Sequence, residues 1–192
     1  MIALVPEANR WLCCEPDGTV RDNGQLPALV FPGSFNPLHR GHLALAKLAS
    51  QRFCQTVSFE LSVANVDKPD LDAEEIQRRL KQFKGLHLVL VTKAATFRAK
   101  AELFPGCIFI VGADTVIRIL QPRYYGDESQ MFQALDAIRA QGCSFLVAGR
   151  IDRGQRFIEL GKLAIPARYQ DLFAGLTESE FRVDLSSTAL RE

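Results

Sequence analysis

The sequence predicts a doubly wound α/β fold, in which helices cover both faces of a parallel sheet. Apolar runs of strand length alternate along the chain with longer segments whose apolar residues recur at helical spacing, a pattern typical of βαβ units. Glycine or proline ends many of these segments. The 192 residues are 47% hydrophobic, which is enough for a domain with a core on each side of its sheet.

The expected strands and helices follow one another in order. Strands are expected at 27–31, 55–65, 87–93, 107–112 and 143–150, and helices at 42–53, 73–84, 95–104, 113–120 and 130–142. The first 25 residues differ, because a turn at Pro16-Asp17-Gly18 separates two short β-rich segments. We therefore expect a β-ribbon over residues 1–25 at the edge of the sheet, and one domain over residues 26–192.

The composition argues against several classes of protein. Lys and Arg number 23 against 22 Asp and Glu, so the chain lacks the basic excess of proteins that hold long nucleic acids. No apolar run approaches the roughly 18 to 20 residues that span a bilayer, and the apolar start is too short for a signal peptide. The five cysteines are odd in number and lack C-x-x-C spacing, which indicates reduced thiols in a cytoplasmic protein.

The segment GSFNPLHRGH lies between an expected strand and an expected helix, where open α/β sheets bind ligands. The start of a helix offers unpaired N–H groups and a positive dipole end, which suit a phosphate. Gly33 and Gly41 permit close approach of the backbone, and Ser34 adds a donor. His39 and His42 are three residues apart, so both imidazoles lie on one face of the first turn and can donate to phosphate oxygens.

Two other interpretations of the histidine pair stay open at this point. The imidazoles could bind a metal ion, although no third His, Cys or Asp accompanies them in the segment. They could also be incidental residues at a satisfied helix cap. A bound polyphosphate is expected to favour the protonated form of an imidazole, whose ordinary pKa is about 6.5. The remaining histidine, His87, starts a strand and is expected to be structural.

Three segments together resemble the signatures of the nucleotidylyltransferase superfamily. GSFNPLHRGH resembles its G-[GST]-F-[DN]-P-x-H-x-G-H pattern, VGADTVIRI its G-x-D segment, and the C-terminal SSTALR its S-S-T-x-x-R pattern. Class I aminoacyl-tRNA synthetases share a related first signature, but this chain has no K-M-S-K-S-like segment and is too short for a tRNA-binding portion. The resemblance implies a three-layer Rossmann-like sheet with strand order 3-2-1-4-5, and ATP-binding residues at Gly33, Ser34, Phe35, Gly41, Gly112, Asp114, Ser186, Ser187 and Thr188.

The resemblance also implies a reaction. A nucleotidyl group passes from ATP to a phosphate-bearing acceptor with release of pyrophosphate, and no protein nucleophile is needed. His42 is expected to act on the α-phosphate, His39 on neighbouring phosphate oxygens, and Ser187, Thr188 and Arg191 on the leaving pyrophosphate. The catalytic residues are therefore His39, His42 and Arg191. Mg²⁺ is expected to be carried by the ATP phosphates, with no metal site formed by the protein itself.

The form of the signatures most resembles the nicotinamide or nicotinate mononucleotide adenylyltransferases, because the phosphopantetheine and cytidylyltransferase branches more often have Thr at the position of His39. Phe97, Tyr124 or Tyr125 would stack on a pyridine ring, since the single tryptophan, Trp11, lies in the ribbon. Another phosphomonoester acceptor, hydrolysis of the nucleotide, and a regulatory module without turnover remain as alternatives, and homo-oligomerisation is open. The expected acceptor-binding residues are Asn65, Lys68, Thr96, Phe97 and Arg150.

Overall fold

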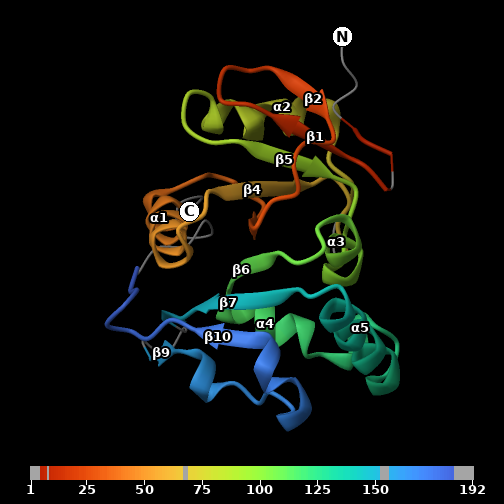
Figure 1. The fold of residues 1–192 in the computed structure, drawn as a ribbon, viewed down its shortest axis with the longest axis vertical. Coiled ribbons are helices and arrows are strands. Elements are labelled where there is room, and N and C mark those ends of the chain that lie inside the picture. The colour runs from red at the N-terminus through yellow and green to blue at the C-terminus, as the bar shows by residue number, and fades with distance from the viewer. Residues whose placement is uncertain (1–4, 8, 67–68, 152–155, 184–192) are drawn as a thin grey trace.

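The computed structural model describes residues 5–7, 9–66, 69–151 and 156–183. Within them one eight-stranded sheet has the order β10-β7-β6-β3-β4-β5-β1-β2, and it runs from β2 at the top of Figure 1 to β10 at the bottom. Five parallel strands, β5-β4-β3-β6-β7, confirm the predicted order 3-2-1-4-5. Their bounds are β3 Leu29–Pro32, β4 Val57–Ser62, β5 Val89–Thr92, β6 Ile108–Gly112 and β7 Ser144–Ala148.

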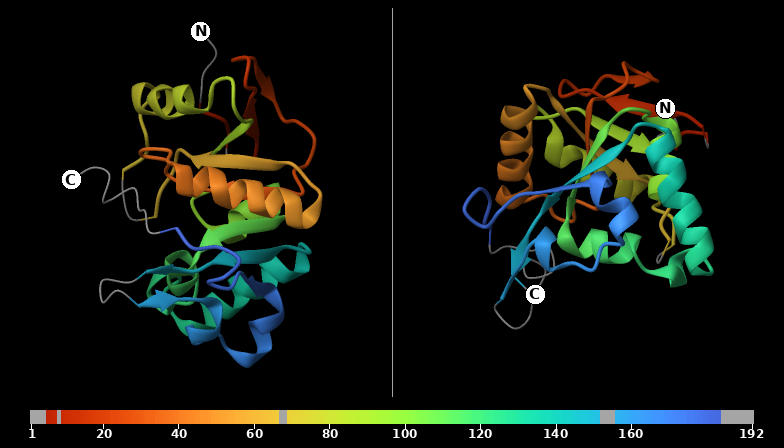
Figure 2. Two further views of the ribbon diagram at one scale, coloured as in Figure 1. Left: turned by 90° about the vertical axis from the view of Figure 1, so that its left-hand side faces the viewer. Right: turned by 60° about the horizontal axis from the view of Figure 1, so that its bottom comes forward.

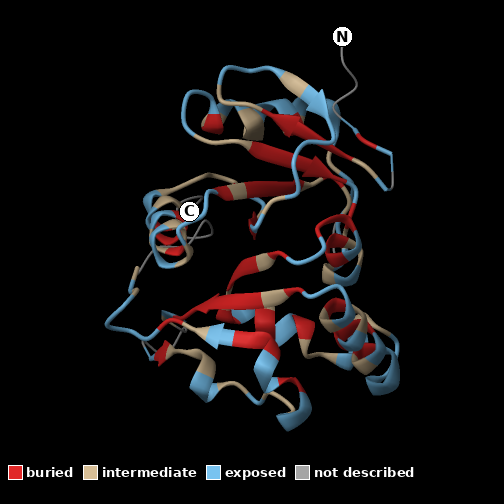
Figure 3. Cartoon of the chain, in the orientation of Figure 1, coloured by how far each residue is buried: buried red, intermediate tan, exposed pale blue. Residues whose placement is uncertain are grey.

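Helices cover both faces of this sheet, as predicted. Successive strand residues point to opposite faces, so Leu29 and Phe31 belong to one buried cluster and Val30 to the other. The first face carries α1 (Arg40–Phe53), α2 (Ala73–Leu80) and the 3-10 helix η1 (Lys81–Phe83), and α1 lies in front of the sheet in the left view of Figure 2. The second face carries α3 (Phe97–Leu103), α4 (Ala113–Ile119) and α5 (Glu128–Ala140). The buried residues of Figure 3 accordingly gather along the strands.

The N-terminal segment forms the expected ribbon at the sheet edge. The strand β1 (Trp11–Cys14) pairs antiparallel with both β5 and β2 (Val20–Asp22). The backbone N–H of Gly85 donates to the carbonyl of Pro16 over 2.8 Å, which ties the ribbon turn to the main domain. Trp11 is buried and packs edge-on against Phe104, with 5.2 Å between ring centroids. The ribbon therefore contributes to the core, and a domain boundary near residue 25 stays a prediction.

Several elements differ from the expectations. The predicted strand 143–150 ends at Ala148, and Arg150 begins a short hairpin of β8 (Arg150–Ile151) and β9 (Phe157–Ile158). An additional strand, β10 (Phe173–Gly175), extends the sheet beside β7. Residues 181–183, which precede the C-terminal signature, are neither strand nor helix, and residues 184–192 lie outside the described part. The remaining short elements are 3-10 helices: η2 (Pro122–Tyr124), η3 (Leu160–Lys162) and η4 (Ala167–Leu172).

The sheet opens where its winding direction reverses. Pairing between β3 and β6 stops at Val30 and Phe109. By contrast, β3 stays paired with β4 as far as Pro32, and β6 stays paired with β7 as far as Gly112. The carboxyl ends of β3 and β6 therefore separate from each other, which is the topological position of ligand crevices in open α/β sheets. Among the described residues, no helix is long and apolar enough to cross a membrane.

Candidate active site

A cavity of about 270 Å³ occupies the crevice between β3 and β6. The ends of three parallel strands and the start of α1 line it, which brings together segments that are far apart in the sequence. Most of the residues predicted from the first and middle signatures meet here. Those that line the cavity are Gly33, His39, Gly41, His42, Gly112 and Asp114, whereas Ser34 and Phe35 do not line it. Arg150, predicted as an acceptor-binding residue, lines the cavity as well.

The two signature histidines cap the first turn of α1 reciprocally. His39 is the N-cap residue, and its Nδ1 accepts the backbone N–H of Gly41 at 3.2 Å. The Nδ1 of His42 in turn accepts the backbone N–H of His39 at 3.3 Å. The two rings stack with 3.7 Å between centroids and 22° between planes. This arrangement is the histidine counterpart of a capping box, and it satisfies N–H groups that a helix start otherwise leaves unpaired.

The caps determine which ring nitrogens can donate. A nitrogen that accepts an N–H carries no proton, so the neutral forms of His39 and His42 are protonated at Nε2. Burial, followed by the nearby His39, lowers the pKa of His42 to about 4, and burial also lowers the pKa of His39. Both rings are therefore neutral Nε2–H donors near pH 7. Because a metal ion on Nδ1 would displace a helix cap, only the Nε2 atoms remain for a ligand, and as N–H groups they can donate to phosphate oxygens.

Phe35 supports the signature loop, which we define as residues 33–38. Its side chain is 1% exposed and its backbone φ is 43°, a left-handed value that residues other than glycine rarely adopt. The ring packs edge-on against Phe31, Phe59 and His42, at 5.7, 5.3 and 5.1 Å between centroids. A Cβ atom on Gly33 would lie 2.6 Å from this ring. The buried Phe35 ring therefore packs beneath the backbone of the signature loop, and this packing requires that residue 33 has no side chain.

Two other glycines at the crevice differ in what surrounds them. A Cβ on Gly41 would lie 3.0 Å from both the His39 Nδ1 and a methyl group of Val183, so a side chain at this position would crowd the cap. A Cβ on Gly112 would meet nothing within 4 Å of protein. Because Gly112 lines the cavity, the open space beside it is available to a ligand that approaches the backbone closely.

Asp114 and Arg150 form an ion pair at the crevice, although Arg150 was predicted to belong to the acceptor site. Asp114 lies in the first turn of α4, and Arg150 follows the end of β7. Both side chains are about half exposed, at 54% and 44%. The structure therefore places Arg150 with the predicted nucleotide-binding residues.

Ser186, Ser187, Thr188 and Arg191 lie outside the described residues. The chain just before them is described, and Phe181 and Val183 line the crevice. The C-terminal segment therefore reaches the mouth of the crevice immediately before its predicted phosphate-binding residues.

The cytidylyltransferase-like family matches residues 30–192, which is most of the chain. The chain belongs to this family. It is also 33% identical over 88 residues to a phosphopantetheine adenylyltransferase of Mycoplasma capricolum subsp. capricolum, and the match covers 43% of this chain and 61% of that protein. Membership of the nucleotidylyltransferase superfamily, predicted from the signatures, is thereby confirmed.

Three of the remaining acceptor residues predicted for this cytidylyltransferase-like protein do not line the crevice. Asn65, Thr96 and Phe97 are all described, and none of them lines the cavity. Thr96 is the N-cap of α3, and its hydroxyl accepts the backbone N–H of Ala99. Phe97 packs into the core against aromatic rings of β6 and β7. Lys68 lies outside the described residues, so the structure does not place it.

Sequence reasoning missed eight residues that line the crevice: Phe31, Pro32, Leu45, Thr115, Ala148, Gly149, Phe181 and Val183. Thr115 and Gly149 each follow a predicted residue or strand, so their position after a strand end was a usable signal. Phe181 and Val183 carried no such signal, because they lie in irregular chain.

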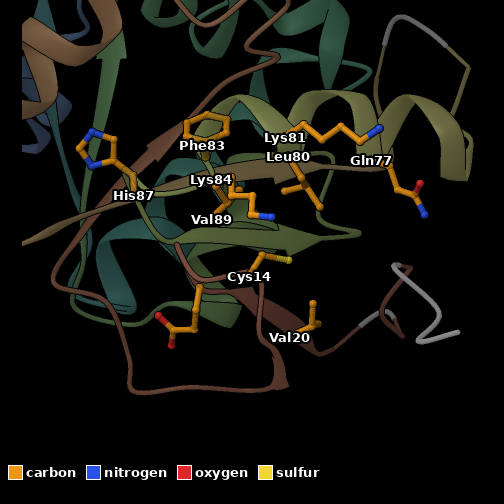
Figure 4. A pocket seen from close by; sticks show the side chains of 11 residues that line it. Cys14, Val20, Gln77, Leu80, Lys81, Phe83, Lys84, His87 and Val89 are labelled. Atoms are coloured by element: carbon orange, nitrogen blue, oxygen red, sulfur yellow. The ribbon is translucent and has the colours of Figure 1, made fainter.

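A second cavity of about 230 Å³ lies between the N-terminal ribbon and the end of α2 (Figure 4). Its lining includes the apolar side chains of Val20, Leu80, Phe83 and Val89, with His87 at one side. The structure describes no acidic or histidine cluster of three or more metal-ligating residues here or elsewhere in its described part. This cavity lies at the start of β5, whereas the signature residues gather at the opposite, carboxyl ends of the strands. The crevice of His39 and His42 is therefore the candidate active site.

Proposed function

We propose that this protein transfers an adenylyl group from ATP to a phosphate-bearing acceptor and releases pyrophosphate. The observation that carries the proposal is the pair of imidazoles held by helix caps as neutral Nε2–H donors at the crevice. Two oriented donors beside a helix start form a site for the phosphates of a nucleotide.

In this reaction an oxygen of the acceptor phosphate attacks the α-phosphorus of ATP. The new P–O bond forms as the bond from the α-phosphorus to the bridging oxygen breaks, and pyrophosphate leaves with those electrons. His42 donates its Nε2–H to an α-phosphate oxygen, whose negative charge grows in the transition state. His39 donates to a neighbouring phosphate oxygen, and Ser187, Thr188 and Arg191 hold the pyrophosphate. The bare backbone at Gly112 lets the nucleotide approach β6, with Asp114 beside it.

We propose that Mg²⁺ enters with the ATP phosphates. Among the described residues that line the crevice, Asp114 carries the one carboxylate, and Arg150 is bound to it. Such a donor set does not form a protein cage for Mg²⁺, but it tolerates an ion held mainly by phosphates and water. The bound ion supplies neutralisation of phosphate charge.

Two acceptors are favoured by different observations. His39 in the first signature favours nicotinamide or nicotinate mononucleotide, as the resemblance implies. The likeness to a phosphopantetheine adenylyltransferase favours 4′-phosphopantetheine. Both compounds are phosphomonoesters and require the same chemistry at His42, so the crevice residues serve either one.

Incubation of the full chain with Mg-ATP and each acceptor in turn tests the proposal. Pyrophosphate release is followed continuously, and the product is identified by mass spectrometry. Formation of an adenylylated acceptor with one acceptor names the substrate. Free phosphate without such a product would indicate hydrolysis, and ATP binding without turnover would indicate a regulatory module. Either of these outcomes would overturn the proposed transferase activity.

A further inference from the structure

The signature loop is held from outside the crevice by side chains of α2 and η1. The side-chain amide of Gln82 donates from Nε2 to the carbonyl of Phe35 and accepts the backbone N–H of Leu38 at Oε1, each over 2.8 Å. Arg79 donates to the carbonyl of Ser34 over 3.0 Å. Arg79 and Gln82 are both described, and neither belongs to the lining of the crevice. These side chains therefore act on the loop and not on a ligand.

Gln82 and Phe83 both contact Phe35 of the signature loop. Gln82 bonds the backbone of Phe35, and Phe83 packs edge-on against its ring with 5.2 Å between centroids. A further contact from Gln82 Nε2 to the carbonyl of Arg79, at 3.3 Å, orients the amide along the helix. Phe35 has the left-handed φ of 43°, which a bulky residue keeps only when its surroundings fix it. The contacts to the ring and to the carbonyl of Phe35 together account for this backbone conformation.

In α2, the carboxylate of Glu75 holds two arginines in place. Glu75 accepts hydrogen bonds from Arg78 and Arg79 at 2.6 to 2.8 Å, and these bonds lower the pKa of Glu75 to about 2. Arg78 also donates to the side chain of Asn36 over 2.7 Å. The charge pairs that the sequence shows along this helix thus continue into the signature loop.

The direction of these bonds bears on anion binding. The carbonyl oxygens of Ser34 and Phe35 carry partial negative charge, and they accept donors from α2 and η1. A carbonyl turned to the crevice would repel a triphosphate, so the bonds keep two such groups engaged elsewhere. The bond to Leu38 also fixes the residue just before the His39 cap. Loop shape and histidine placement are therefore linked through one amide.

We propose that Gln82 is a positioning residue for nucleotide binding: its amide holds the signature loop in the shape that presents His39 and His42 to the triphosphate. This role rests on the proposed function. If Gln82 has this role, α2 and η1 affect nucleotide binding through the loop, although their side chains do not touch the nucleotide.

The test compares Gln82→Met with Gln77→Met in the full-length chain. Methionine matches the size of glutamine but makes neither bond. Gln77 is an exposed residue of the preceding helix α2, and it lines the second cavity. Mg-ATP affinity is measured by calorimetry, the titration of the two imidazoles by NMR, and turnover with the active acceptor by pyrophosphate release. We expect Gln82→Met to bind Mg-ATP about tenfold or more weakly, to raise KM for ATP, and to move the His42 titration upward toward its ordinary range. Gln77→Met should match the wild type in all three.

Unchanged Mg-ATP affinity together with an unchanged His42 titration in Gln82→Met would overturn the proposal. If the wild type binds no ATP, the proposed function fails, while the imidazole titration still decides whether Gln82 positions the histidines. Should Gln82→Met fail to fold, Gln82→Glu replaces it. This variant keeps the acceptor for Leu38 but sets a carboxylate against the Phe35 carbonyl, so it should show the same shifts in affinity and titration, and their absence refutes the role.

Discussion

The two nitrogens of His42 have separate tasks, and two substitutions can separate them. Asparagine places an oxygen near the position of Nδ1, so His42→Asn keeps an acceptor for the His39 N–H but loses the Nε2 donor. Glutamine places an N–H near the position of Nε2, so His42→Gln keeps a donor but loses the cap acceptor. His42→Ala loses both.

The expected magnitudes differ between turnover and stability. Loss of a donor to developing transition-state charge costs about 2.7 to 4 kcal/mol of barrier, which is about a hundredfold to thousandfold in kcat. Loss of a helix-cap acceptor costs about 0.5 to 2 kcal/mol of folding free energy, and the long 3.3 Å contact places it toward the lower end. His42→Asn should therefore lose at least about two decades of kcat with nearly unchanged stability. His42→Gln should lose more stability but less turnover, and His42→Ala should keep the fold and lose at least about a hundredfold in kcat.

Pyrophosphate release at saturating Mg-ATP and acceptor measures kcat, and urea unfolding at neutral pH measures the free energy of unfolding. The comparison between the two near-isosteric variants is the decisive control, since each serves as the reference for the other. Wild-type turnover in His42→Asn, or a larger loss of kcat in His42→Gln than in His42→Asn, would refute the assignment of the donor to Nε2.

The structure supports further predictions on stability and ligand binding. Burial and the neighbouring imidazole lower the pKa of His42 from 6.5 to about 4, so its contribution to stability is complete above pH 6.5 and is lost as the pH falls toward 4. Between about pH 7.5 and pH 5 the wild type should lose ~2 kcal/mol more than His42→Asn in urea unfolding, and parallel curves would contradict this. Gly33→Ala should lower the free energy of unfolding by about 1 to 3 kcal/mol, because its Cβ would lie 2.6 Å from the packed Phe35 ring. An unchanged melting curve would contradict this role of the Phe35 ring. Gly112→Ala should stay within about 1 kcal/mol of the wild type but weaken Mg-ATP binding in calorimetry, since only a ligand competes for that space. Lys100 of α3 donates to both carboxylate oxygens of Glu60 in β4, at 2.7 and 2.8 Å, and both side chains are buried. Lys100→Met should therefore lose about 3 to 5 kcal/mol in urea unfolding, because the Glu60 carboxylate stays buried without its cation, and an unchanged free energy of unfolding would contradict this.

The parallel part of the fold was predictable because each strand is a separate apolar run. The strands β3 to β7 are buried on both faces, so their sequences are mostly apolar, and glycine or proline marks most of their ends. The exception is β4, whose interior includes Ser58 and the buried Glu60. The strands β8, β9 and β10 have only two or three residues each, which is too short for any periodicity. β10 exists because it pairs with β7, and that long-range pairing is invisible in local sequence.

The site was predictable as far as it depends on chain position, and less so where it depends on side-chain geometry. Gly112 ends β6, and His39 and His42 come after the end of β3, so the topology brings them to one crevice. Phe97 also follows a strand end, but the first turn of α3 turns its ring into the core. Arg150 was predicted to bind the acceptor. Its ion-pair partner, Asp114, follows the neighbouring strand β6 and is 36 residues away in the sequence, so the pairing could not be seen locally. Pairing of this kind depends on strand order and on register together.

The cap geometry explains why imidazoles suit both signature positions. A lysine or arginine could donate to a phosphate but could not accept a backbone N–H. A serine or threonine can cap a helix and donate, but it does both through a single oxygen. Imidazole separates acceptor from donor across a rigid ring, so the folding of α1 fixes the tautomer, and the tautomer directs the donor. His39 occupies the N-cap, where threonine caps nearly as well. His42 lies in the third helical position, and only a side chain with the length of the imidazole ring can accept the cap N–H at one end and donate into the crevice at the other. Threonine in place of His39 is therefore compatible with the capping role, and the requirement for imidazole concentrates at His42.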